Sequence, residues 1–383
     1  MAYQHTVLSQ VLKMIPRHEV EAIGLKHHAG QKFRKINHWS HFLVMLVAQI
    51  SGASSLREAV SGFLSNSRYY YHLGCRGIAR STLARANSQQ PWEIFRELYF
   101  LLAKRAPLRG KHKFKFPNKL ISMDATTISL CQSCFSWAKH RRKKAGIKLH
   151  IGLNHNTEIP DFVDMTNAKE HDSKNAKSIS FEAGAIYVMD RGYFDYILFN
   201  RMDLSDAGFV TRMKRNSKYR IITRNRVVTG SGVTSDANIQ LTGIRTRNCT
   251  APLRRIGYRD PETGKHYVFI TNIASLDAAT IAGIYKDRWK IELFFKWVKQ
   301  NLRIKKFFGR TENAVLTQVW IAMITYLLCQ ILKALCIPGT QLLDISRRLK
   351  YTLFHRAELL DALHCRQREP IVQTNENQLV MKF

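Results

Sequence analysis

The sequence predicts an α/β fold, in which a mixed sheet with helices on its faces follows an all-helical N-terminal part. Three observations support this prediction. Residues 1–106 have apolar positions at helical spacing, the segment after residue 119 falls into short β-rich runs, and strands then alternate with helices. With 383 residues, 45% of them hydrophobic, the chain is long enough for about two or three domains with full cores.

Charge limits the class of partner. The chain has 60 Lys and Arg against 28 Asp and Glu, which gives a formal net charge of +32 at pH 7. A field of this size attracts polyanions, so we expect DNA or RNA as the main partner and not a small neutral substrate. A basic structural protein has a similar composition and stays an alternative at this point. Few, scattered cysteines and an N-terminus without an apolar signal segment predict a cytoplasmic location.

Residues 1–106 are predicted to form a helical N-terminal domain that binds DNA ends. Helical spacing is clearest in residues 38–50, 54–63 and 91–102. A short helix that carries Arg80 and Arg85 follows a turn after the second of these, as in a helix-turn-helix that reads a DNA groove. A plain helical bundle with a basic surface is the alternative.

A basic linker, residues 107–118, leads to the first part of the core, residues 119–213. Within the core we expect strands and helices in this order: strands at 119–130, 147–154 and 159–166, a helix from Asp172, a strand that ends at Asp190, a helix from Tyr193 and a strand near 208–213. Residues 214–274 are β-rich and read as an insertion.

The core is predicted to continue over residues 275–340. A long helix from about Leu276 to Asn301 is followed by an apolar helix near residues 318–335, and residues 341–383 are a C-terminal tail region. The apolar stretch 319–337 has the length of a membrane span. Because it contains Gln330 and Lys333, we interpret it as a buried core helix and expect no membrane partner.

Two aspartates stand out because acids are scarce. Asp124 lies inside an apolar β run, and Asp190 ends another. A carboxylate buried alone costs several kcal/mol, so each needs a cation, a partner or partial exposure. Taken alone, either one is explained by a helix cap or an ion pair.

The segment from Tyr285 to Lys299 places a third carboxylate on one side of the predicted helix. With Tyr285 at zero and ~100° per residue, Arg288 falls near ~300° and Glu292 near ~340°. Lys299 falls near ~320°, so the four project within ~60° of one another along ~21 Å of helix. The opposite face collects apolar residues: Ile284, Ile291, Phe294, Phe295 and Val298.

This exposed stripe suits a metal beside a phosphate backbone. A solvated face with an Arg288–Glu292 ion pair is the alternative. Three carboxylates on two adjacent strands and a helix supply the oxygen ligands that Mg²⁺ prefers, and two such ions catalyse in-line displacement at phosphorus. The sequence therefore indicates a metal site set in a basic surface.

These residues resemble those of bacterial insertion-sequence transposases of the DDE class, the group typified by insertion sequence 4. The signature Y-(2)-R-(3)-E-(6)-K is met in full by Tyr285, Arg288, Glu292 and Lys299. The first Asp of ISMDATTISL and the first of YVMDRGYFD fit the two upstream positions. The resemblance runs from about residue 119 to about residue 335, and the helical N-terminal part is also similar to that of related transposases.

The resemblance implies a ribonuclease H-like core in which Asp124, Asp190 and Glu292 are the catalytic residues and bind two Mg²⁺ or Mn²⁺ ions. It implies that Tyr285, Arg288 and Lys299 hold DNA phosphates at the transposon end. The basic stretch that follows Glu292, with Lys296 and Arg303, is predicted to extend this DNA-binding surface.

The implied partners are double-stranded DNA, as terminal inverted repeats and as target, and a second copy of the chain in a homodimer that pairs two ends. The implied location is the bacterial cytoplasm, at the nucleoid when DNA is bound. The implied reaction is cleavage at the repeats, commonly through a hairpin, and then attack of the 3′-hydroxyl on target DNA.

The sequence departs from the family at one step. Some relatives use a Trp of the insertion to stabilise a flipped base during hairpin formation, and residues 205–288 contain no Trp here. Tyr219, Tyr258 and Tyr267 are the candidate substitutes. Two alternative functions stay open: a structure-specific nuclease of the same fold, and a DNA-binding protein derived from a transposase.

Overall fold

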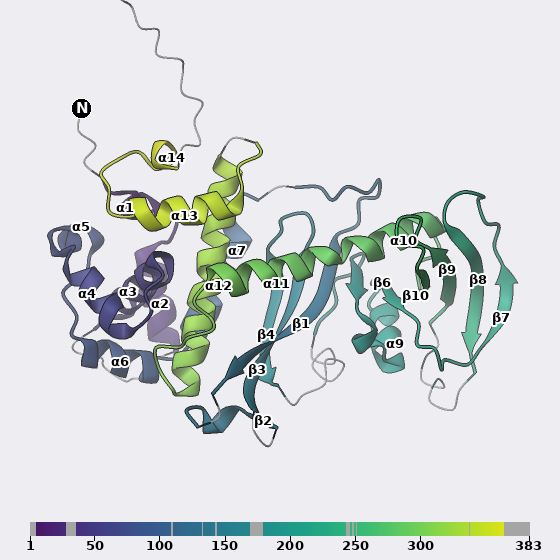
Figure 1. Cartoon of the computed structure of the whole chain (residues 1–383), viewed down its shortest axis with the longest axis horizontal. Helices are drawn as coiled ribbons and strands as arrows, with labels where there is room; N and C mark the ends of the chain where they lie inside the picture. The colour runs from purple at the N-terminus through teal and green to yellow at the C-terminus, as the bar shows by residue number, and fades with distance from the viewer. Residues whose placement is uncertain are drawn as a thin grey trace, which may run out of the picture.

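The computed structural model describes residues 5–27, 36–108, 110–131, 133–141, 144–168, 179–242, 246, 249, 251–336 and 338–363. A helical part occupies one end of the elongated molecule, and a long sheet extends from it to the other end (Figure 1). Asp172, where a helix was expected to begin, lies outside the described residues.

The described part of residues 1–106 is helical, as the periodicity predicts. Its elements are α1 (Val7–Leu12), α2 (Arg17–His27), α3 (His38–Ser51), α4 (Leu56–Leu64), η1 (Ser67–Tyr69), α5 (Tyr70–Leu73), α6 (Arg80–Gln89) and α7 (Glu93–Arg105). The side chain of Asn37 caps α3 by accepting the N–H of Ser40, and α3 ends at Gly52, whose φ of 75° favours glycine.

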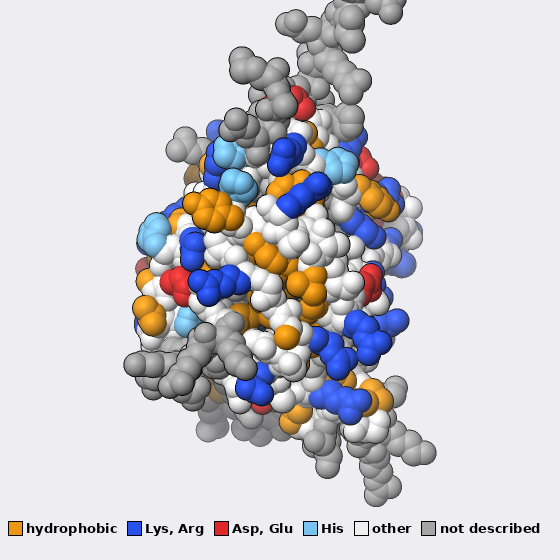
Figure 2. Space-filling view, turned by 90° about the vertical axis from the view of Figure 1, so that its left-hand side faces the viewer, with side chains coloured by type: hydrophobic (Ala, Val, Ile, Leu, Met, Phe, Trp, Pro, Cys, Tyr) orange, Lys and Arg blue, Asp and Glu red, His pale blue; other side chains and the backbone are white. Residues whose placement is uncertain are grey.

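The expected helix-turn-helix is not formed. Its two helices would be α4 and α6, but η1 and α5 stand between them, whereas the motif joins its helices by a turn of about three or four residues. The intervening segment packs back on α4, where the ring of Tyr70 stacks on Phe63 with a centroid distance of 4.9 Å. Figure 2 shows the face at this end of the molecule, where Lys and Arg side chains outnumber Asp and Glu.

In the described part of the chain, ten strands form one mixed sheet. They are β1 (Leu120–Leu130), β2 (Lys139–Arg141), β3 (Lys144–Asn154), β4 (Pro160–Asn167), β5 (Ile186–Met189), β6 (Gly208–Arg212), β7 (Tyr219–Arg224), β8 (Val233–Leu241), β9 (Leu253–Arg259) and β10 (His266–Thr271). Their order is β2-β3-β1-β5-β6-β10-β9-β8-β7, with β4 also paired to β3.

The centre of the sheet combines two pairing directions. β1 is antiparallel to β3, and β3 is antiparallel to β4. β1 is parallel to β5, and β5 is parallel to β6, with η4 (Arg191–Tyr193) and α9 (Tyr196–Leu204) between β5 and β6. The β-rich residues 214–274 do not fold apart from this sheet. They extend it, because β10 pairs antiparallel with β6. The strands β9, β8 and β7 then follow in this order toward the edge of the sheet.

The long expected helix is interrupted. A single residue, Arg288, separates α10 (Ala278–Asp287) from α11 (Trp289–Asn301). α12 (Glu312–Leu335) follows, and it is long and apolar enough to cross a membrane. Its apolar window is entirely buried within the protein, so α12 is a core helix.

One hydrophobic core joins the N-terminal helices to the rest. α12 packs against α3, α6 and α7, and the same cluster of buried side chains includes one face of β3 and the apolar side of α11. Trp320 of α12 is 1% exposed and its ring lies 5.7 Å from that of Tyr99 on α7. The predicted domain boundary near residue 106 therefore falls within a shared core.

The residues after 340 begin with helices and not with an extended tail. α13 (Leu342–Thr352) and α14 (Leu359–Ala362) pack on the N-terminal part. The N–H of Val7 donates to the carbonyl of His355, at 3.0 Å, and Thr6 and Arg356 form a β-bridge. The described C-terminal segment thus closes against the start of the chain.

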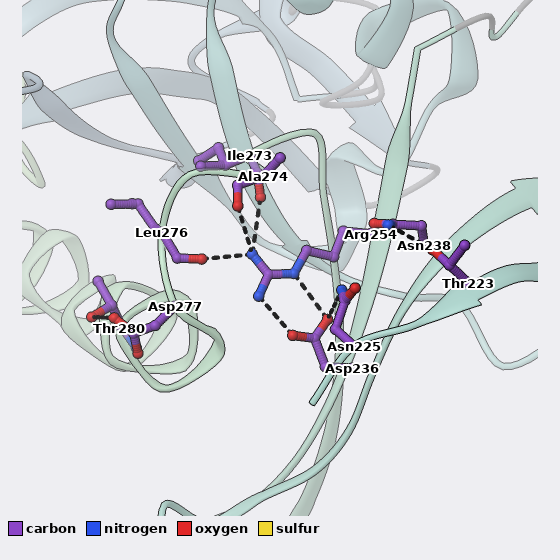
Figure 3. A network of polar contacts seen from close by, with 10 residues as sticks. All are labelled: Thr223, Asn225, Asp236, Asn238, Arg254, Ile273, Ala274, Leu276, Asp277 and Thr280. Atoms are coloured by element: carbon purple, nitrogen blue, oxygen red, sulfur yellow. Dashed lines mark hydrogen bonds and ion pairs between the residues drawn. The ribbon is translucent and has the colours of Figure 1, made fainter. Parts of the chain in front are cut away.

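A buried ion pair fixes the sheet extension to α10 (Figure 3). Arg254 of β9 and Asp236 of β8 are 8% and 5% exposed, and the Arg254 guanidinium bonds both carboxylate oxygens, at 2.9 and 2.7 Å. The same guanidinium donates to the carbonyl of Leu276, at 2.6 Å, just before the cap of α10. Since α10 leads to Arg288, this pair helps to set the position of the candidate site.

Candidate active site

The sheet register places Asp124 and Asp190 side by side. Met123 of β1 is the partner of Met189 of β5 in the parallel pairing, and each Met is followed by one of the two aspartates. Neighbouring strands lie about 4.8 Å apart, so the carboxylates leave the sheet at adjacent positions. Both are partly exposed, because β5 ends at Met189 and uncovers this part of the sheet.

Glu292 is brought to the same place by α11. Its carboxylate oxygen Oε1 accepts a hydrogen bond from Nη2 of Arg288, at 2.7 Å. Nη1 of the same guanidinium lies 3.4 Å from Oδ2 of Asp124. Arg288 therefore bridges two of the three predicted catalytic residues, and the predicted Arg288–Glu292 ion pair is present as one part of this cluster.

Asp190 has two other partners. The Tyr285 hydroxyl donates to its Oδ1, at 3.2 Å, and Nη2 of Arg212 lies at the same distance from that oxygen. Tyr285 does not lie on an exposed stripe as the helical projection predicts, because it is 8% exposed and Phe269 of β10 covers its ring. Burial raises the pKa of the Tyr285 hydroxyl to about 12, so it remains a hydrogen-bond donor at neutral pH.

The surroundings push the pKa values of the two aspartates apart. Burial raises the pKa of Asp124 to about 6; the Ala125 N–H and Arg288 oppose this rise, and the charges of Asp190 and Glu292 add to it. Burial acts in the same direction on Asp190. There, the Arg191 N–H and the charges of Arg288 and Arg212 outweigh it, so the pKa of Asp190 is lowered. The three acids thus interact, and Asp124 is the one whose charged form is destabilised.

We expect Asp124→Asn to stabilise the metal-free protein at neutral pH. The folded-state pKa lies above the ordinary 3.8, so the contribution of Asp124 to stability is present below about pH 4 and is lost as the pH rises through about 6. The neutral variant should gain on the order of 2 kcal/mol in the free energy of unfolding above pH 6. Urea unfolding with a chelator present, between about pH 4 and about pH 8, measures this gain.

Asp190→Asn is the matched control with the opposite sign. Its lowered pKa contributes stability that is present above the ordinary 3.8 and is lost as the pH falls through the folded-state value, so the variant should be less stable than the parent at pH 7. If the effect of Asp124→Asn is the same at both ends of the pH range, Asp124 is not under electrostatic stress.

The three carboxylates are of the right chemical type to bind a hard divalent cation, but they are not arranged around a common point. Carboxylate oxygens are the ligands that Mg²⁺ and Mn²⁺ prefer, and the pKa of Asp124 stays raised by burial although Arg288 opposes the rise, so a further cation would stabilise its charged form. Among the residues that the structure describes, however, no three His, Cys, Asp or Glu side chains are close enough to hold a metal. Arg288 lies between Asp124 and Glu292, so a cation there requires its guanidinium to turn away.

The predicted DNA-binding residues divide into two groups. Tyr285 and Arg288 touch the carboxylates, and Lys299 adjoins them because its Nζ bonds the hydroxyl of Thr126, two residues after Asp124 on β1. Lys296 is exposed on α11, and Arg303 lies in the segment after α11. Among the described residues, neither of these two forms a hydrogen bond with the three carboxylates.

A buried Ser-His-Asp network lies behind the site. Nδ1 of His155, in the turn between β3 and β4, is 2.9 Å from Oδ2 of Asp287, and Nε2 is 2.6 Å from the hydroxyl of Ser122. Ser122 precedes Asp124 by two residues and is 0% exposed, so it is no nucleophile. Because Asp287 is adjacent to Arg288, the network connects β1 to the junction of α10 and α11.

Replacing His155 by Phe should destabilise the protein by about 2 kcal/mol, since it removes two buried hydrogen bonds: the Ser122 hydroxyl loses its side-chain partner, and Asp287 keeps only Lys113 and Lys290. Because the sequence predicts an enzyme that cleaves DNA, we also expect the change to reduce the rate of cleavage more than it weakens DNA binding, since it loosens the position of Arg288 and removes no DNA contact. Urea unfolding and a cleavage assay measure the two effects. His18→Phe, at an exposed position, is the control, and an unchanged unfolding free energy for His155→Phe would rule out the positioning role.

Some site residues were not predicted individually. Arg212 lies in the basic stretch 209–226, in which no residue is distinguished by sequence alone. His155 and Asp287 are 132 residues apart, and only the folded chain brings them together. Thr126 had a weak signal, because it shares a strand face with Asp124 at a spacing of two.

Comparison with known proteins gives evidence that is independent of the geometry of the site. Residues 115–328 match the family described as the transposase DDE domain, and residues 3–76 match a family described only as a domain of unknown function. A protein of Sinorhizobium fredii (strain NBRC 101917 / NGR234) that carries the name transposase y4zB is 32% identical over 284 residues, which are 72% of this chain and 78% of that protein.

Two further relatives are also named as transposases. One belongs to insertion sequence element IS5377 of Geobacillus stearothermophilus and is 29% identical over 334 residues, 85% of this chain and 84% of the relative. The other belongs to element IS4SA of Synechocystis sp. (strain ATCC 27184 / PCC 6803 / Kazusa) and is 27% identical over 303 residues, 77% of this chain and 83% of the relative.

Proposed function

The chain belongs to the transposase DDE domain family, and from this premise we propose that it cuts DNA at the terminal inverted repeats of an insertion sequence and joins the 3′-hydroxyl ends to target DNA. The family makes it a metal-dependent enzyme that acts on nucleic acid. The observation that carries the finer proposal is the cluster of Asp124, Asp190 and Glu292 around Arg288, set in a protein of net charge +32.

We propose further that the core is ribonuclease H-like. Support comes from the strand order β4-β3-β1-β5-β6, in which an antiparallel meander is followed by two parallel strands. The predicted catalytic aspartates leave the central strand β1 and its parallel neighbour β5 at adjacent positions. In this arrangement the strands β10, β9, β8 and β7 are an insertion that extends the sheet.

Asp124, Asp190 and Glu292 would hold the divalent ions, Mg²⁺ or Mn²⁺. When bound, two such ions activate the attacking oxygen and stabilise the leaving oxygen at a phosphate. The protein contributes the positions of the three carboxylates: Asp124 and Asp190 are fixed by the pairing of β1 with β5, and Glu292 by the packing of α11. In the absence of metal, the Arg288 guanidinium is the cation that pairs with Asp124 and Glu292.

The cations of the site would bind DNA phosphates. The Arg212 side chain is 36% exposed and lies beside Asp190, so its guanidinium can reach a phosphate that passes the carboxylates. Charged donors bind phosphate oxygens strongly, and Arg does so through two bonds at once. We therefore add Arg212 to the proposed phosphate-binding residues Tyr285, Arg288 and Lys299.

A hairpin intermediate is compatible with an aromatic cleft next to the site. The cleft has a volume of about 470 Å³ and is lined by Tyr258, Tyr267, Phe269, Tyr285 and Trp289, among others. An aromatic face can stack on a base that has left the helix. Tyr258 and Tyr267 therefore fit the role that a Trp of the insertion has in relatives, whereas the ring of Tyr219 lies against Arg255.

The partners follow from the reaction. Two transposon ends must be brought together before target joining, so we propose a homodimer on two inverted repeats, acting on double-stranded DNA in the bacterial cytoplasm at the nucleoid. The excess of Lys and Arg over Asp and Glu supplies the attraction for DNA without regard to its sequence.

The test is to incubate the purified protein and Mg²⁺ with linear DNA that carries the element's own ends, found as inverted repeats beside the gene. Nicked or hairpin ends together with joined products are expected. Nicking without joining would instead identify a nuclease of the same fold. Binding without nicking, by protein that is folded and saturated with DNA, would contradict both enzymatic functions.

A further inference from the structure

A basic cleft lies beyond the carboxylates, where the ends of α3 and α11 meet α13. Its volume is about 540 Å³, and its lining contains six cations and no Asp or Glu: Lys299, Arg303, Lys305, Lys306, Arg347 and Lys350. None of the six takes part in an ion pair between described residues. Two distant parts of the sequence, residues 299–306 and 347–350, thus bring unneutralised positive charge to one place.

The segment after α11, which carries Arg303, Lys305 and Lys306, is held in place by a side chain of α12. Gln318 of α12 is 1% exposed, and its amide nitrogen donates to the carbonyls of Arg303 and Lys306, at 2.6 and 2.9 Å. Its amide oxygen accepts the N–H of Phe308, at 2.9 Å. The irregular segment after α11 is therefore anchored to the core helix, and its side chains are presented by a fixed backbone.

Gly52 provides the room in which two of the cations converge. A Cβ at this position would lie 3.2 Å from Nη2 of Arg303 and 3.6 Å from Nζ of Lys350. The guanidinium and the ammonium group thus both lie over the backbone that ends α3. Two like charges that close repel each other unless an anion lies between them.

The electrostatics of neighbouring groups agree with this. The pKa of Lys299 is lowered, by burial and then by the charge of Lys305. Glu58 of α4 is the acid on which Arg303 and Lys350 act, but its carboxylate is already bonded to the N–H and the hydroxyl of Ser54, both at 2.7 Å. One carboxylate cannot offset six cations, so the cleft keeps a surplus of positive charge.

The cleft continues from the carboxylate cluster. Lys299 follows Glu292 on α11 by seven residues, which is ~10.5 Å along the helix, and it bonds Thr126 beside Asp124. A small cavity lined by Thr127 and Ser129 of β1 shares Lys299 and Lys305 with the larger cleft. A chain of phosphates that passes Asp124 has an uninterrupted basic path from there to α13.

We propose that this cleft holds the sugar–phosphate backbone of the DNA strand that passes the Asp124–Asp190–Glu292 cluster, so that Arg347 and Lys350 of α13 belong to the DNA-binding surface. The inference rests on the proposed function. A single phosphate does not need six cations spread over α11, the segment after it and α13, whereas a DNA strand presents one phosphate after another along its length.

The test is the salt dependence of binding to a duplex that carries the element's own end, measured by fluorescence anisotropy from about 50 to about 200 mM salt. Each lost phosphate contact makes the plot of log K against log salt concentration less steep by about 0.9. Arg347→Gln with Lys350→Gln should therefore flatten the slope by about 2. Both side chains are exposed, so the variant should fold.

Two control variants separate the cleft from total charge. Arg347→Lys with Lys350→Arg keeps both charges and should keep the slope of the parent. Lys13→Gln with Lys104→Gln removes two exposed charges outside the cleft and should leave the slope nearly unchanged. The proposal is overturned if the cleft variant keeps the parent's slope, or if the distant pair flattens it equally.

Truncated duplexes test the placement of the strand. The effect of the cleft variant should vanish on a duplex that lacks one side of the cleavage point and should persist on a duplex that lacks the other. Persistence on both would place the contacts away from the strand next to the cut and would contradict the proposal. If one of these contradicting results is obtained while the parent protein still cleaves end DNA, only this inference fails and the proposed function stands.

Discussion

Replacing Asp124, Asp190 or Glu292 by Ala should lower the rate of DNA strand cleavage by on the order of a thousandfold or more, while binding to the element's ends changes little. Each carboxylate would supply metal ligands that nothing nearby can replace, since Arg288 and Arg212 are their close partners and both are cations. The measurement is single-turnover cleavage of end DNA at saturating protein, with binding followed separately.

Binding by these variants has a definite expected direction. Removing a negative charge from a basic DNA surface does not weaken attraction to phosphates, so the affinity for end DNA should be equal to that of the parent or higher. Glu262→Ala, an exposed acid that pairs with Lys286, is the matched control and should cleave at the parent's rate. Full activity in any one of the three Ala variants would remove that residue from the catalytic set.

Replacing Arg254 by Met should destabilise the protein by about 3–5 kcal/mol, because it leaves the buried carboxylate of Asp236 without its cation. Asp236 is 5% exposed, and Asn225 would be its only remaining side-chain partner among the described hydrogen bonds. The loss of the bond to the Leu276 carbonyl also frees the start of α10. Urea unfolding measures the effect on stability.

The double variant Arg254→Met with Asp236→Leu is the control. Removing both charges eliminates the unpaired carboxylate, so most of the lost stability should return. Cleavage should not return to the same extent, since the bonds from Arg254 to the segment before α10 are absent in both variants. If the single variant is as stable as the parent, the buried pair is not what joins the sheet extension to α10.

The sequence singles out the candidate site residues more readily than it predicts their surroundings. Asp124, Asp190 and Glu292 are visible because acids are scarce in this chain and because strand and helix periodicity are local properties. That Met123 pairs with Met189 depends on contacts between segments far apart in the chain, which periodicity does not report. The register alone places the two aspartates side by side.

The burial of Tyr285 shows the same limit. A helical projection gives the direction of its side chain but not what lies opposite, and Phe269 of β10 covers it. The residues of the insertion read correctly as strands, yet their pairing with β6 is a long-range choice. Gln318 and Gly52 give no signal at all, because their roles consist of contacts with Arg303.

The most direct test of the central claim is a crystal structure of the protein with Mn²⁺ and end DNA, with anomalous scattering used to locate the metal. Asp124, Asp190 and Glu292 should then coordinate two Mn²⁺ ions, and the Arg288 guanidinium should have moved from between them to a DNA phosphate. Manganese bound elsewhere, with Arg288 still bridging Asp124 and Glu292 in protein that cleaves DNA in solution, would contradict the assignment of these three residues as the metal site.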